Sequence, residues 1–90
     1  MTTDTLPSGA LRSMSMHKLF ELVREDWSRP YFGAVPYIDA LMALTDSGYY
    51  GLDSWQDLAI YFLGNANTWR GPTARAVKAE LHRRLKEDQQ

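Results

Sequence analysis

DSWQDLAIYFLGNA, residues 53–66, carries the strongest helical signal in this chain. Its apolar side chains recur at intervals of three and four residues, which places them on one face of a helix. Ser54 followed by Asp57 has the spacing of a capping box, and Asp53 with Gln56 offers a second register. We therefore predict a helix with a wide buried face formed by Trp55, Leu58, Ala59, Phe62, Leu63 and Ala66.

Three further helices are predicted on either side of this stretch. The first follows the N-cap residue Ser15 and runs from Met16 to Trp27, with Phe20 among its apolar positions. The second covers 36–45, and the last of the four helices, counting 53–66 as the third, runs from Pro72 to about residue 87. The expected fold is an all-α, single-domain bundle of about four short helices with angled crossings.

The remaining segments show no helical or strand period. Residues 1–13 are small and polar, so we expect a mobile N-terminal tail followed by one helical domain at 14–88. Tyr31, Phe32 and Val35 lie in the connection between the first two helices, and three large apolar groups there are expected to fill the core. The pair Tyr49–Tyr50 is too short to predict a strand.

Composition excludes several classes of protein. The 90 residues are 44% hydrophobic and 23% charged with a net charge of −1, which is typical of one small globular domain. The absence of cysteine excludes disulfide frameworks, thiolate zinc sites and cysteine nucleophiles. No apolar run reaches the ~18 residues of a membrane span, and no signal peptide is visible, so we expect a cytoplasmic protein.

The chain lacks the motifs of known catalytic sites. Phosphate-binding glycine loops, metalloprotease helices and serine-nucleophile elbows are all missing. An enzyme would need a pocket that brings His17 or His82 against a carboxylate, and neither histidine lies in a ligand or catalytic pattern. We therefore expect a non-enzymatic protein with no cofactor and no metal.

Aromatic residues outside the predicted helices indicate a protein-binding surface. Tyr49 and Tyr50 lie in a loop, and Trp69 and Arg70 lie at the corner before the last helix. Tyr, Trp and Arg are enriched at binding hot spots. The leading hypothesis is a small helical interaction module that binds a partner protein through these four residues. The competing interpretation is that Trp69 caps the core, with its indole N–H bonded locally.

Acidic and basic side chains are distributed unevenly along the chain, and this distribution supports nucleic-acid binding as an alternative function. Residues 1–69 contain four basic and eight acidic side chains, whereas residues 70–90 contain six basic and three acidic ones. A basic stripe on the last helix could follow the phosphates of a nucleic acid, although exposed helix faces are commonly charged without any such role. Opposed charges also permit head-to-tail association of copies. The stripe consists of Arg75, Lys78, His82, Arg83 and Lys86.

Three runs resemble a family of short bacterial proteins that are carried largely on plasmids and other mobile elements. They are PYFGAVPYIDAL (30–41), YFLGNANTWRG (61–71) and TARAVKAEL (73–81). This sequence departs from the family pattern at Pro72 and at Trp55–Gln56. The resemblance implies a small accessory factor whose partner is a host protein or a nucleic acid, and it implies no activity, cofactor or catalytic residue.

Overall fold

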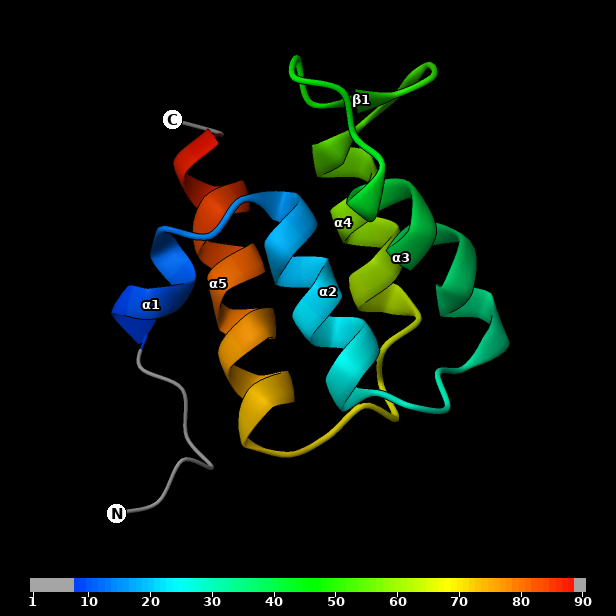
Figure 1. Ribbon diagram of the computed structural model, residues 1–90, viewed down its shortest axis with the longest axis vertical. Helices are drawn as coiled ribbons and strands as arrows, with labels where there is room; N and C mark the ends of the chain where they lie inside the picture. The colour runs from blue at the N-terminus through cyan, green and yellow to red at the C-terminus, as the bar shows by residue number, and fades with distance from the viewer. Residues whose placement is uncertain (1–7, 89–90) are drawn as a thin grey trace.

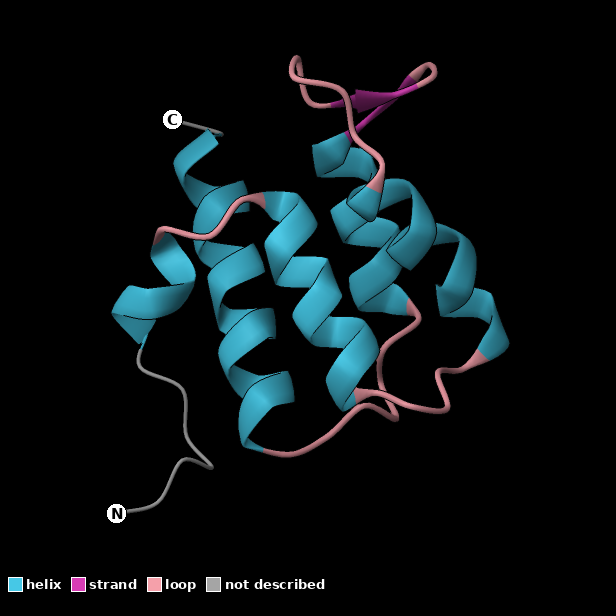
Figure 2. Cartoon of the chain, viewed as in Figure 1, coloured by secondary structure: helices cyan, strands magenta, loops and turns pink. Residues whose placement is uncertain are grey.

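The computed structural model describes residues 8–88, with side chains from residue 10 onward. Within this range the all-α fold is confirmed, with one very small sheet in addition. Helices α2 to α5 run alternately in opposite directions, and the sheet lies at one end of them (Figures 1 and 2). The elements are α1 (Ser8–Arg12), α2 (Met16–Asp26), the 3-10 turn η1 (Phe32–Ala34), α3 (Val35–Met42), β1 (Tyr49–Tyr50), β2 (Asp53–Ser54), α4 (Trp55–Gly64) and α5 (Pro72–Asp88).

The core is centred on Phe62 of α4. Its ring meets the edge of Phe20 from α2 at a centroid distance of 4.9 Å. Trp27, at the end of α2, and Trp69, in the loop before α5, lie 6.4 and 6.2 Å from the same ring. These edge-to-face arrangements are the favoured geometry for aromatic pairs. One cluster of rings therefore joins α2, α4 and the start of α5.

Two serine caps set the start of the helices that carry this cluster. The Ser15 hydroxyl accepts the backbone N–H of Lys18 at 3.1 Å, and the Ser54 hydroxyl accepts that of Asp57 at 3.3 Å. Both bonds satisfy a backbone donor that the first turn of a helix leaves free. The predicted caps are thus confirmed. On α4, Leu58, Ala59 and Phe62 are buried, as the period predicts.

The expected tail at residues 1–13 is wrong for residues 8–12, which form α1. Leu11 is buried in the core, and α1 contacts α5. A helix of five residues with one large apolar side chain leaves no period in the sequence, so only its contact with α5 explains its formation. The domain accordingly begins earlier than 14, while residues 1–7 of the expected tail lie outside the described residues.

The connection before α3 does not fill the core, contrary to expectation. Phe32 is 79% exposed, and Tyr31 and Val35 are exposed as well. The short turn η1 instead directs only Ala34 inward. A Cβ at Gly33 would lie 2.6 Å from the Tyr31 ring and 2.7 Å from the Asn65 amide oxygen, so a side chain at this position would have to displace both groups.

A buried carboxylate ties α5 to the N-terminal segment. Glu80, only 5% exposed, accepts two bonds from Arg83, at 2.7 and 3.0 Å, and one from Arg84. Arg84 in turn donates to the carbonyls of Leu11 and Met14, at 2.9 and 2.7 Å. The hydrogen bonds from Arg83 lower the pKa of Glu80, burial opposes them, and Arg84 adds to the lowering.

The Phe62→Ala substitution tests whether this ring is the centre of the core. We expect a loss of about 3–5 kcal/mol in the free energy of unfolding, measured by urea denaturation, because the cavity would lie among three other rings. Ile60→Ala, on the exposed side of the same helix, should cost less than about 1 kcal/mol. Similar small losses for both variants would show that the buried face is misassigned.

The Glu80 cluster predicts a pH-dependent contribution to stability. Since the folded-state pKa of Glu80 is lowered from 4.5, its contribution is present above about pH 4.5 and is lost as pH falls through the folded value. Glu80→Gln should cost about 3 kcal/mol at pH 7, because two partly buried guanidinium groups lose their partner, and much less in strong acid. Glu87→Gln is the exposed control. An equal cost for Glu80→Gln at both pH values would contradict the cluster.

Candidate functional site

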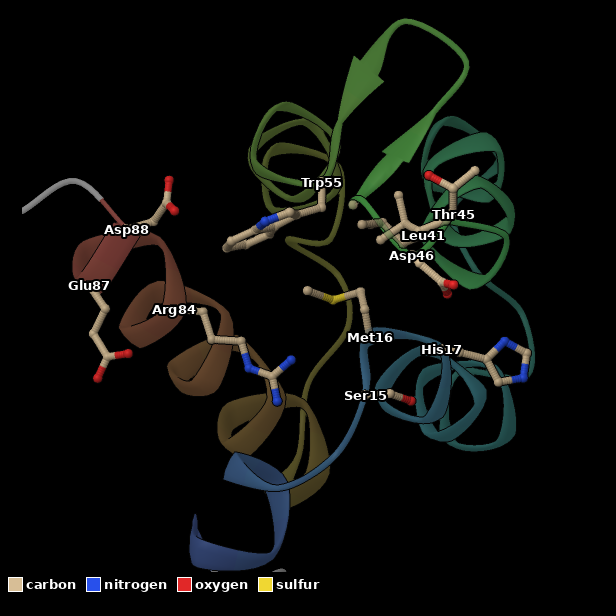
Figure 3. Close-up of a pocket in the computed structure, with 12 residues that line it drawn as sticks. Ser15, Met16, His17, Leu41, Thr45, Asp46, Trp55, Arg84, Glu87 and Asp88 are labelled. Atoms are coloured by element: carbon tan, nitrogen blue, oxygen red, sulfur yellow. The ribbon is translucent and has the colours of Figure 1, made fainter.

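A groove of about 700 Å³ lies at one end of the helices. It lies where α2 and α4 begin and where α3 and α5 end, next to the hairpin of β1 and β2 (Figure 3). Its floor is apolar and its rim is mostly polar or charged. The lining residues are Ser15, Met16, His17, Leu41, Leu44, Thr45, Asp46, Gly48, Trp55, Arg84, Glu87 and Asp88.

Gly48 positions Trp55 as one wall of the groove. Gly48 has a φ of +86°, which side chains other than glycine rarely adopt, and its carbonyl accepts the backbone N–H of Trp55 at 2.8 Å. A Cβ on Gly48 would lie 3.0 Å from the Trp55 ring. The sequence predicted Trp55 on the buried face of its helix, but at the first helical position it is only half-buried. Its place in the wall of a groove was not predicted from the sequence.

The charged residues of the groove differ in whether they already have partners. Arg84 is held by Glu80 and two carbonyls, and Glu87 accepts a hydrogen bond from Arg83 at 2.7 Å. Asp88 accepts only the amide of Gln56, also at 2.7 Å. Asp46 and Asp88 take part in no ion pair within residues 8–88. Among the described residues, these two carboxylates of the groove are therefore without a cationic partner.

His17 borders the groove and is paired with a carboxylate. Its Nδ1 lies 2.7 Å from the Met42 carbonyl and its Nε2 lies 3.0 Å from Glu21. Glu21 does not line the groove, and in Figure 3 the imidazole points away from the centre of the groove. These contacts join the first turn of α2 to the end of α3. His82, the other histidine, is exposed on α5.

Tyr49 and Tyr50 are exposed on a hairpin rather than in an irregular loop. Tyr49 pairs with Ser54 and Tyr50 with Asp53 in antiparallel register. Gly51 has a φ of +62° and Leu52 does not have a positive φ, as in a type II′ turn, and this turn chemistry is the signal that sequence reasoning missed. Leu52, at the tip, is 99% exposed.

Trp69 is not a surface contact residue. It is 2% exposed, its ring stacks on Trp27 at 5.7 Å, and its indole N–H donates to the Asp26 carboxylate at 2.8 Å. Arg70 is exposed, but its loop precedes α5, at the opposite end of the domain from the hairpin (Figure 1). The structure thus separates the predicted four-residue site: Tyr49 and Tyr50 lie together, and Trp69 belongs to the core.

The predicted basic stripe on α5 is also interrupted. Lys78 donates to the carbonyls of Ala66 and Trp69, at 2.8 and 2.7 Å, and its ammonium lies 5.9 Å from the centre of the Trp69 ring. Burial lowers the pKa of Lys78, and nearby Arg70 lowers it further. Arg83 is bound to Glu80 and Glu87. Of the five stripe residues, those still exposed are Arg75, His82 and Lys86.

A second group of aromatic side chains, missed from the sequence, gathers where α3 begins and α4 ends. The rings of Tyr31 and Phe32 lie 4.8 Å apart, and those of Tyr37 and Tyr61 lie 5.5 Å apart. Tyr31 borders a hollow of about 300 Å³ that is otherwise lined by polar and glycine residues of the loop after α4. No periodic signal predicted this group, because its members come from three segments.

Within residues 8–88, no helix is both long and apolar enough to cross a membrane, and no three potential metal ligands are grouped together. Comparison of the chain with protein-family models, curated proteins and solved structures gave no match. The resemblance carried by residues 30–41, 61–71 and 73–81 therefore stays a prediction.

Proposed function

We propose that the protein is a non-enzymatic interaction module that binds a segment of a partner protein in the groove beside the hairpin. The observation that carries this proposal is the position of Leu52, 99% exposed at the tip of a hairpin whose two flanking residues, Gly48 and Trp55, line the groove. Exposed apolar groups gathered next to a hollow are typical of partner-binding sites.

The tyrosines of the hairpin support the same surface. Tyr49 and Tyr50 are each about half exposed, so they can lose water on binding at little cost in side-chain entropy. The apolar floor, formed by Met16, Leu44 and Trp55 above the fully buried Leu41, offers apolar surface to the partner. Two of the four residues first predicted for this function, Tyr49 and Tyr50, therefore belong to the proposed surface.

Photo-crosslinking from position 52 tests the proposal. A photoreactive phenylalanine analogue at Leu52 should give a crosslink to one protein in an extract of cells that express this chain. Phe32, which is also largely exposed but lies before α3, is the matched position and should not crosslink to that protein. The specificity of the crosslink is then measured by competition.

Excess unlabelled wild-type protein should abolish the crosslink. The competitor Tyr50→Ala/Leu52→Ala should be at least about tenfold weaker, since two exposed contacts are removed without touching the core. The competitor Phe32→Ala should equal wild type. The proposed function would be overturned if the wild type and both variants competed at the same concentration. The absence of a crosslink from position 52 would also overturn it.

Nucleic-acid binding through α5 is the alternative, and it has weaker support because two of its five residues have intramolecular partners. Titration of ¹⁵N-labelled protein with a random DNA duplex at low salt separates the two. We expect no shift changes at Arg75, His82 and Lys86. Shifts confined to α5 that disappear at about 200 mM salt would favour the alternative instead.

A further inference from the structure

We propose that the segment bound in the groove is basic and amphipathic, with apolar side chains on the floor and Lys or Arg side chains on Asp46 and Asp88. This inference rests on the proposed function and adds the chemistry of the partner.

The floor suits the aliphatic part of such a segment. Met16 and Leu44 contribute flexible or branched apolar groups above the fully buried Leu41, and the Met16 thioether adapts to different ligand shapes. Trp55 is half-buried beside them, so one part of its indole remains open to a ligand. An indole face attracts ammonium and guanidinium groups, and the stems of Lys and Arg pack well on apolar surface.

The charges of the rim select a cation. Asp46 comes from the loop after α3, and Asp88 comes from the end of α5, on the opposite side of Trp55 (Figure 3). Both are exposed, and neither has a cationic partner within the described residues. The one guanidinium that lines the groove, Arg84, is directed to Glu80 and the Leu11 and Met14 carbonyls. A bound Lys or Arg side chain would therefore meet two carboxylates with little competition from the cationic side chains of this protein.

A second copy of this chain fits the groove less well. The exposed cations of α5 are Arg75, His82 and Lys86, but the apolar face of α5 is already buried in its own core, through residues such as Val77 and Leu81. The exposed apolar group that a neighbouring copy offers beside His82 and Lys86 is Ile60, with the partly buried Leu63 next to it, which is a smaller apolar surface than one face of an amphipathic segment. Association of copies is accordingly an outcome that the experiment detects.

The probe is a fluorescein-labelled peptide of leucine and lysine at amphipathic helical spacing, with a matched peptide of leucine and glutamate. Binding to the full chain is measured by fluorescence anisotropy, and the site is located with ¹⁵N-labelled protein. We expect the lysine peptide to bind with shifts at Met16, Leu44 and Trp55, and the glutamate peptide to bind at least about tenfold more weakly.

Charge reversal provides the matched variants. Asp46→Lys/Asp88→Lys should weaken the lysine peptide at least about tenfold. Glu25→Lys/Asp39→Lys changes the net charge equally, at exposed carboxylates outside the groove, and should stay within about twofold of wild type. Both variants should retain the helical circular dichroism of wild type, because all four side chains are exposed.

Each remaining outcome overturns the inference in a distinct way. Equal weakening by the two double variants would show binding to overall charge alone. Equal or tighter binding of the glutamate peptide at the groove would retain the proposed function but refute the preference of the groove for a basic segment. A crosslink from position 52 combined with no binding of either peptide would have the same meaning. If sedimentation shows that the wild type forms dimers and that the Asp46→Lys/Asp88→Lys variant is monomeric, the groove binds a second copy instead.

Discussion

The enclosure of Phe62 by three other aromatic rings is the contact on which the arrangement of the helices depends. Phe20 and Trp27 approach it from α2, and Trp69 approaches it from the loop before α5. Trp69 can be buried because its indole N–H has a carboxylate acceptor in Asp26, so no polar group is left unsatisfied. This single cluster fixes α2, α4 and the start of α5 relative to one another.

The Trp69 loop and Glu80 together determine which charges of α5 stay available. Lys78 lies beside Trp69, and its ammonium donates to two carbonyls of the loop that contains Trp69. These bonds remove one cation from the basic face of α5. Glu80 takes up Arg83 and Arg84 on the next turn and joins α5 to the segment around Leu11. Much of the positive charge of the last twenty residues therefore stabilises the fold. A helix rich in Lys and Arg is a phosphate-binding surface only when those groups face solvent without partners.

The two ends of the domain differ for a related reason. At the end with the Trp69 loop, apolar groups pack inward around Phe62, while the rings of Tyr31, Phe32 and Tyr61 are exposed and the partly buried Tyr37 lies against Tyr61. At the other end, helix starts and helix ends surround a hollow, because the hairpin projects outward from Gly48 and Trp55 instead of covering it. The proposed binding surface is thus a consequence of how short elements meet at one end of a small bundle.

The helices with a clear period were predictable because burial of one face imposes a spacing of three to four residues. The N-caps at Ser15 and Ser54 and the buried face around Phe62 followed directly from that spacing. Helix α1 and the hairpin were not predictable in this way, since a five-residue helix and two-residue strands are too short to carry a period. Their formation depends on contacts with α5 and on the turn at Gly51.

The candidate site was only partly visible in the sequence. Tyr49 and Tyr50 were identified as aromatic residues outside the predicted helices, whereas Trp69, identified in the same way, proved to be buried. By itself the sequence determined an all-α domain and the inward faces of its longer helices, because periodicity encodes which side of each element leaves water. Only the tertiary structure decided which aromatic and charged side chains remain free, since the Asp26 carboxylate and the Ala66 carbonyl, distant in the sequence from the groups they bind, take up Trp69 and Lys78.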